Sequence, residues 1–147
     1  MPTTVQALFE SNEITKTFVT NWNSNIRTEA SGVYIVSVSE DPNWLPREPL
    51  TITLNEKTLG QWIKTVTGFS IDNNPATIPA LTSRLEEFWL PDESILYIGK
   101  APKRAKGTGL RTRVGEYYRT QIGASSPHSG GQWIQTLNDL DDYYVHY

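Results

Sequence analysis

The sequence of 147 residues contains no cysteine. This absence excludes disulfide bonds, thiolate zinc sites and cysteine nucleophiles, and it is consistent with a reducing compartment such as the cytoplasm. Histidine is scarce too, because His128 and His146 are the only two and their spacing does not match that of metal ligands. Neither a glycine-rich phosphate loop nor a Gly-x-Ser-x-Gly nucleophile elbow occurs. The sequence therefore lacks most standard catalytic motifs.

Long apolar runs are also missing. No stretch approaches the roughly 18 apolar residues of a membrane helix, and no charged-then-apolar leader opens the chain. Aromatic residues make up 11% of the sequence, which excludes disorder of the whole chain. A chain of this length buries about two-thirds of its unfolded surface in one core. We therefore expect a single cytoplasmic domain over residues 1–147, with no membrane partner.

Charge is distributed unevenly along the chain. The formal net charge is −3, yet residues 100–119 hold seven basic groups and one acidic group, a local net charge of +6. The other residues hold six basic and fifteen acidic groups, a net charge of −9. A single basic segment on an acidic body is typical of a local anion-binding site. A nucleic acid is therefore expected to approach from the basic side only.

Runs of β-branched and aromatic residues predict strands at 32–39, 95–99 and 143–147, and a shorter alternating run predicts one at 50–54. Helical spacing of apolar residues predicts helices near Val5, after Asn55, after Thr77, after Thr108 and over 132–137. The spacing of Phe18, Trp22 and Ile26 predicts a further apolar helical stripe. These elements together indicate an α+β fold.

Tyrosine, arginine and lysine are the residues here that can carry chemistry. Tyr34 and Tyr97 lie in predicted strands, and Arg113 and Tyr117 are four apart, so they share a helix face. A guanidinium binds phosphate oxygens and stabilises the charge that develops when a phosphodiester is attacked. A phenol can orient a water or, if its pKa is lowered, remove its proton. Taken singly, each tyrosine is more typical of a packed strand aromatic than of a catalytic group, and Arg113 is more typical of a surface helix.

Three segments, Gly32-Val33-Tyr34, Tyr97-Ile98-Gly99-Lys100-Ala101 and Leu110-Arg111-Thr112-Arg113-Val114, together resemble the GIY-YIG nuclease pattern. The loop at 128–131 before an apolar segment adds to the match, which spans roughly 32–39 and 94–137. That family includes homing endonucleases, excision-repair nuclease subunits, some restriction enzymes and structure-specific resolvases. The resemblance implies a small three-stranded antiparallel sheet flanked by helices. It also implies a metal-dependent endonuclease that hydrolyses DNA phosphodiester bonds.

The resemblance assigns roles residue by residue. Tyr34 and Tyr97 would flank the scissile phosphate, with Tyr34 as the favoured general base, and Arg113 would be the catalytic arginine. Tyr117 falls where many members carry a histidine or tyrosine, and Lys100 would position a phosphate or lower the pKa of a phenol. The expected substrate-binding residues are Gly99, Lys103, Arg104, Lys106, Arg111 and His128. Gly99 would let the backbone approach the DNA, and a solvent-exposed loop residue is the alternative interpretation of His128.

The chain departs from the family pattern between the two tripeptides. A short hairpin usually joins them, whereas 62 residues separate Tyr34 from Tyr97 here. We interpret 43–93 as an inserted, mostly helical element, because insertion at a hairpin tip costs little loop-closure entropy. This insertion is also a candidate docking surface for a protein partner, or a second DNA-binding element.

The second departure concerns the metal. The family holds one divalent ion, such as Mg²⁺, with a Glu on a helix after the third strand, whereas this sequence ends at Tyr147, in or just after the predicted third strand. Glu116 is the only Glu near the motif, and it lies in the wrong element. The metal ligand is therefore unidentified. Either it follows residue 147, and this chain alone is weak or inactive, or the chain is a non-catalytic nucleic-acid- or protein-binding module on the same fold.

Overall fold

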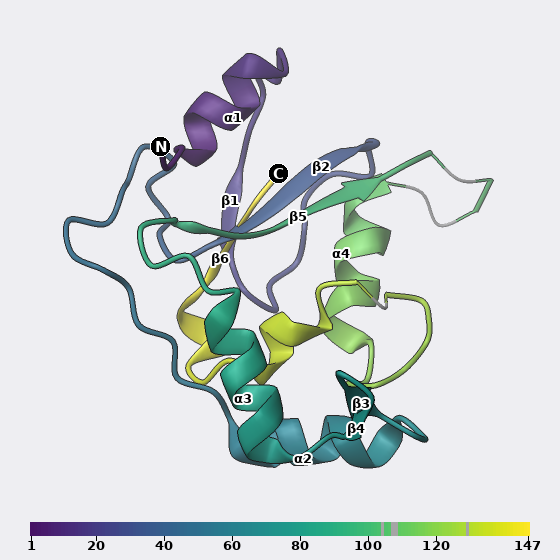
Figure 1. The fold of residues 1–147 in the computed structure, drawn as a ribbon. Coiled ribbons are helices and arrows are strands. Elements are labelled where there is room, and N and C mark those ends of the chain that lie inside the picture. Colours follow the sequence, from purple (N-terminus) through teal and green to yellow (C-terminus); the bar gives the residue numbers. More distant parts are fainter. Residues whose placement is uncertain (104, 107–108, 129) are drawn as a thin grey trace. The chain divides into compact units, whose positions relative to one another are not determined.

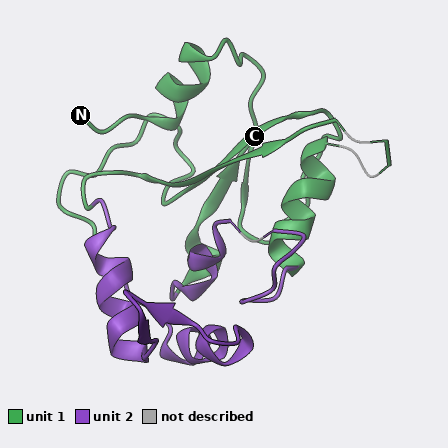
Figure 2. Ribbon diagram, turned by 45° about the vertical axis from the view of Figure 1, so that its right-hand side comes forward, with its two compact units in different colours: residues 1–50, 91–119, 139–147 green, residues 51–90, 120–138 purple. Residues whose placement is uncertain are grey.

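The structure, a computed structural model, describes residues 1–103, 105–106, 109–128 and 130–147. Arg104, the helix cap predicted at Thr108, and Ser129 of the 128–131 loop lie outside the described residues. The chain divides into two compact units, shown in Figure 2. Unit 1 comprises 1–50, 91–119 and 139–147, and unit 2 comprises 51–90 and 120–138. The predicted insertion thus supplies most of unit 2, together with a segment from the C-terminal part of the chain.

Unit 1 is built on a four-stranded antiparallel sheet with the order β1-β6-β2-β5 (Figure 1). The strands are β1 (Val19–Asn21), β2 (Gly32–Ser37), β5 (Ile95–Ala101) and β6 (Tyr144–His146). The predicted strands at 32–39, 95–99 and 143–147 are therefore confirmed, and so is the α+β class. The sheet has one strand more than predicted, because β1 pairs with β6 at its edge.

The helical stripe predicted from Phe18, Trp22 and Ile26 is wrong. Residues 19–21 form β1, and Val19 lies opposite His146 in the ladder with β6. Spacing of four residues fits a helix, but pairing with a strand distant in the sequence overrides this local preference. The Trp22 ring instead packs edge-on against Tyr118, with ring centroids 4.9 Å apart.

Helices cover both faces of this sheet. Neighbouring residues of a strand point to opposite faces, so Ile35 and Tyr34 of β2 face different helices. Ile35 belongs to a core cluster with Val5 and Phe9 of α1 (Val5–Ser11). On the other face, α4 (Gly109–Arg119) packs against β2 and β5.

Unit 2 contains both helices predicted within the insertion, and each begins at its predicted cap. The Asn55 side chain accepts a hydrogen bond from the Thr58 N–H at 3.0 Å, and α2 spans Glu56–Thr65. The Thr77 side chain accepts a hydrogen bond from the Ala80 N–H at 3.3 Å, and α3 spans Ile78–Glu87. Local capping chemistry therefore sets both helix starts.

Shorter elements complete the chain. In unit 2, β3 (Ser70–Ile71) and β4 (Asn74–Pro75) form a small hairpin, and the segment predicted as a helix over 132–137 is a 3-10 helix, η1 (Gln132–Thr136). In unit 1, a second 3-10 helix, η2 (Leu140–Asp142), precedes β6. The strand predicted at 50–54 does not form, since only Leu54 makes a bridge, to Leu137. Among the described residues, every helix is too short or too polar to cross a membrane.

Candidate functional site

Three tyrosine rings pack together in unit 1. Tyr34 of β2 lies 6.1 Å from Tyr97 of β5 and 6.2 Å from Tyr117 of α4, measured between ring centroids. Tyr97 and Tyr117 are closer still, at 5.3 Å. The two strand tyrosines share the face of the sheet on which α4 packs, so all three rings converge there. We call these three residues, with Arg113, the tyrosine–arginine cluster.

Gly99 makes this packing possible. It lies directly opposite Tyr34 in the β2–β5 ladder. A Cβ atom at Gly99 would clash with the ring of Tyr34, so the ring occupies the space above the glycine backbone. The resemblance implies that Gly99 allows a close approach by the substrate. The structure shows instead that Tyr34 makes the close approach.

Arg113 joins the cluster from α4. It lies four residues before Tyr117 on the same helix face. Its guanidinium donates a hydrogen bond to the Tyr34 hydroxyl and another, at 3.3 Å, to the Glu116 carboxylate. The side chain of Arg113 keeps 23% of its surface exposed, whereas Tyr34 and Tyr117 are fully buried. Within the cluster, Arg113 therefore offers charge to the solvent.

Burial governs the ionisation of the buried phenols. It raises the pKa of Tyr34 well above its ordinary value, and the neighbouring Tyr97 raises it further, against the opposing effect of Arg113. Burial raises the pKa of Tyr117 in the same way, with smaller contributions from the two other tyrosines. Both phenols therefore keep their protons at neutral pH. The predicted role of Tyr34 as a general base needs a pKa shifted the other way, so the structure does not support it.

Apart from Arg113, the basic residues of 100–119 that the structure describes are exposed. Lys100 pairs with Val33 and is exposed, and its side chain leaves β5 on the face opposite Gly99. Lys103 and Lys106 are exposed on the connection between β5 and α4. The Lys100 side chain therefore points away from the phenols, because neighbouring strand residues face opposite sides, and its predicted role next to them is wrong.

Arg111 holds a loop rather than facing the cluster. Its Nε donates to the carbonyl of Ile26 at 3.0 Å, and its Nη2 donates to the carbonyl of Arg27 at 3.2 Å. Its Nη1 donates to the Glu29 carboxylate at 2.8 Å. These bonds satisfy the backbone of the segment that leads into β2. The predicted substrate contact is thus replaced by a structural one.

His128 belongs to unit 2 and is fully buried. Its carbonyl accepts a hydrogen bond from Gln132 Nε2 at 3.2 Å, and the same nitrogen donates to the Ala124 carbonyl. Gln132 Oε1 in turn accepts from the Gly123 N–H at 2.7 Å. The Gln132 side chain therefore links the backbone at three positions of this loop. The alternative of a solvent-exposed histidine is therefore wrong. The substrate-binding role stays a prediction.

The acidic residues present do not make a metal site. Glu116 lies on α4 and not on a helix after the third strand, and its carboxylate forms a salt bridge with Arg113, which balances its charge. In the described part of the chain, no three His, Asp or Glu side chains are arranged to hold a metal ion. A magnesium site needs several oxygen ligands around the ion.

Comparison of the chain with family models, curated proteins and solved structures gave no match.

Proposed function

We propose that the chain is a DNA endonuclease domain of GIY-YIG type that hydrolyses phosphodiester bonds at the tyrosine–arginine cluster. The observation that carries the proposal is the convergence of Tyr34, Tyr97 and Tyr117 beside a partly exposed Arg113. These residues come from β2, β5 and α4, the elements that the resemblance assigns to the active site. Both the geometry and the chemistry of the side chains suit an anionic phosphate.

Arg113 is the phosphate-binding group in this proposal. A phosphate oxygen would take over hydrogen bonds of the guanidinium that now go to Glu116, because both acceptors carry negative charge. Water attacks phosphorus, the P–O bond to one deoxyribose breaks, and the proton lost by the water passes through solvent to the leaving oxygen. Negative charge builds on the non-bridging oxygens in the transition state. A fixed guanidinium stabilises that charge more than it stabilises the bound substrate.

Tyr34 is a positioning residue rather than a base. Its hydroxyl accepts a hydrogen bond from the Arg113 guanidinium and is also hydrogen-bonded to the Tyr97 hydroxyl. The bond between the two tyrosines orients the hydroxyl of Tyr97, which is less buried than Tyr34. In this proposal the Tyr97 hydroxyl orients the attacking water.

A second candidate function is a nucleic-acid-binding module without catalysis. The complete burial of Tyr34 and its raised pKa favour this candidate, because the Tyr34 phenol keeps its proton and cannot take one from water. The exposed lysines Lys100, Lys103 and Lys106 would then supply phosphate contacts alone. The two functions differ in a single measurable property, the breaking of a DNA strand.

The test is a nicking assay on supercoiled plasmid, with Mg²⁺ and with a chelator in parallel. We expect Arg113→Ala to slow nicking about 100- to 1000-fold, the usual effect of removing one group that stabilises transition-state charge. Arg119→Ala is the matched control, because Arg119 is an exposed arginine at the end of the same helix. Nicking by the unmodified chain that Arg113→Ala leaves unchanged would overturn the assignment of the site.

DNA binding measured on the same samples separates the two candidates. Salt-dependent binding with no nicking under any divalent metal would favour the non-catalytic module. Loss of nicking with chelator would establish the predicted requirement for a divalent ion. The protein partner predicted for 43–93 stays a prediction, with the exposed Phe88 and Leu90 as the apolar residues that such a partner would cover.

A further inference from the structure

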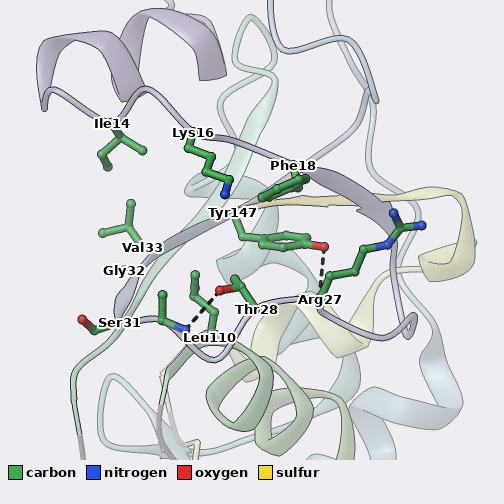
Figure 3. Close-up of a pocket in the computed structure, with 11 residues that line it drawn as sticks. Ile14, Lys16, Phe18, Arg27, Thr28, Ser31, Gly32, Val33, Leu110 and Tyr147 are labelled. Carbon is green, nitrogen blue, oxygen red and sulfur yellow. Dashed lines mark hydrogen bonds between the residues drawn. The ribbon is translucent and has the colours of Figure 1, made fainter.

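A cavity of about 460 Å³ lies in unit 1, where β2 and α4 begin (Figure 3). Gly32 and Leu110 border it, two and three positions before Tyr34 and Arg113 of the cluster. The volume falls in the range of pockets that hold small organic ligands. The four residues of the tyrosine–arginine cluster do not line this cavity.

One wall of the cavity is aromatic. Phe18 stacks on Tyr147, with ring centroids 5.7 Å apart and an angle of 30° between the ring planes. The Tyr147 hydroxyl accepts a hydrogen bond from the backbone N–H of Arg27 at 3.3 Å, which holds the buried ring in place. Phe18 leaves 39% of its surface exposed. The stack therefore presents a fixed aromatic surface on which a planar ring could lie.

The charge at the cavity is positive. The Lys16 ammonium lies 5.9 Å from the centroid of the Phe18 ring, and Figure 3 shows it directed into the cavity. The described residues that line the cavity include no Asp or Glu. Within the part of the chain that the structure describes, Lys16 forms no salt bridge. Arg27 also lines the cavity, but its guanidinium points away beyond the Tyr147 hydroxyl.

The remaining walls are apolar with a polar rim. Ile14, Val33 and Leu110 supply aliphatic surface, and Thr28 and Ser31 bring hydroxyl-bearing side chains to the lining. A ligand that matches this lining is flat and partly apolar, and it carries an anionic group at one end.

We propose that this cavity is a nucleotide-binding pocket, in which the base lies against Phe18 and the phosphate is bound by Lys16. A nucleotide combines the planar ring and the single anionic group that the lining selects, and aromatic side chains are common stacking partners for bases. The ligand is either a mononucleotide or an unpaired nucleotide within a DNA strand. The proposal goes beyond the nuclease function and does not depend on it, because it concerns binding alone.

The experiment titrates the full chain with deoxyadenosine monophosphate and with deoxyadenosine, using calorimetry and NMR. We expect the nucleotide to shift the resonances of Phe18, Val33 and Leu110, and Lys16→Gln to weaken its binding about tenfold, as for loss of one charge-assisted hydrogen bond. Lys16→Gln should leave the binding of deoxyadenosine unchanged. Arg27→Gln is the matched control and should have little effect, because this cation at the same cavity points away from it.

Phe18→Leu tests the aromatic wall and should weaken the binding of both ligands. Phe18 is exposed enough for the substitution to leave the fold intact.

Single-stranded oligo(dA) that binds more tightly than the mononucleotide, with the same dependence on Lys16, identifies the strand as the source of the ligand. Binding of the mononucleotide without tighter binding of oligo(dA) identifies the free mononucleotide as the ligand. No shifts at the cavity, or equal weakening by Lys16→Gln and Arg27→Gln, would overturn the pocket. Arg113→Ala should leave the binding of deoxyadenosine monophosphate unchanged, so failure of the nuclease proposal remains distinguishable.

Discussion

The hydroxyl of Tyr34, a fully buried residue, is hydrogen-bonded to the guanidinium of Arg113 and to the phenol of Tyr97. A solvent-exposed phenol would exchange its hydrogen bonds with water, whereas the buried Tyr34 keeps the same two partners. Gly99 contributes by what it lacks, because any side chain there would displace the ring. The cluster is therefore preorganised, a property that favours binding of a developing charge.

His146 is a second residue whose surroundings determine its charge. Its Nε2 atom lies 2.9 Å from the Ser37 hydroxyl and 2.9 Å from the Ser39 carbonyl, and the residue is almost fully buried. Burial lowers the pKa of His146, while the hydrogen bond to Ser39 and the charge of Asp41 act in the opposite direction. The imidazole is thus held neutral in the folded chain.

A pH dependence of stability follows from this shift. The unfolded chain takes up a proton on His146 as the pH falls through about 6.5, whereas the folded chain resists protonation. We therefore expect the free energy of unfolding to be constant with respect to this group above about pH 6.5 and to fall below it, until the folded pKa is passed. Urea unfolding at several pH values, compared with His146→Gln, measures the effect. Identical pH profiles for the two proteins would contradict it.

At the scale of elements, Arg111 ties α4 to the segment before β2. Three of its nitrogen atoms hold backbone or side-chain oxygens of residues 26–29. The backbone adds to this, because the Arg111 N–H donates to the carbonyl of Thr28 at 3.0 Å. The position of Gly32, and hence the start of β2, depends on this connection.

Arg111→Ala should therefore destabilise the fold without touching the cluster. We expect a loss of about 1–2 kcal/mol, given that two backbone carbonyls lose donors while the exposed ion pair with Glu29 contributes little. Arg111→Lys should recover only part of this, because an ammonium cannot reproduce the planar fork. Thermal or urea unfolding gives the measurement. Arg119→Ala, on the same helix, should change stability by less than about 0.5 kcal/mol.

At the scale of the whole molecule, the chain is acidic, but the basic segment 100–119 lies entirely in unit 1. This unit also holds the tyrosine–arginine cluster and the cavity beside Lys16. Unit 2 carries three basic and four acidic side chains, a net charge of −1. Unit 1 as a whole carries ten basic and twelve acidic side chains, a net charge of −2. Attraction of a polyanion is therefore expected at the basic segment itself and not over the whole unit.

A salt titration tests this expectation. The double substitution Lys103→Glu and Lys106→Glu should weaken DNA binding and reduce the slope of log K against log salt concentration by about two, one for each lost phosphate contact. The control pair is Lys57→Glu and Lys64→Glu on α2, which makes the same change of charge in unit 2. Fluorescence anisotropy over a series of salt concentrations gives both slopes. Equal effects of the two pairs would show that only net charge matters.

Local chemistry explains what could be predicted at the scale of elements. Asn55 and Thr77 start their helices through hydrogen bonds that span three residues, and a β-branched run predicted β2. The strand β1 could not be predicted, because its partner His146 lies at the other end of the chain and the spacing of its neighbours imitates a helix. The cavity beside Lys16 could not be predicted either, because four segments that are distant in the sequence line it.

The sequence by itself determined the α+β class, the helix caps, the basic segment and the residues from which a phosphate site could be made. Only the tertiary structure decided which of these residues meet. It brought Tyr34, Tyr97, Tyr117 and Arg113 together. It also placed the Lys100 side chain on the opposite face of the sheet and made Arg111 a structural residue that binds the segment before β2. The physical reason is that residue type and local spacing are properties of the chain. Burial, pKa shifts and convergence arise only when distant segments pack.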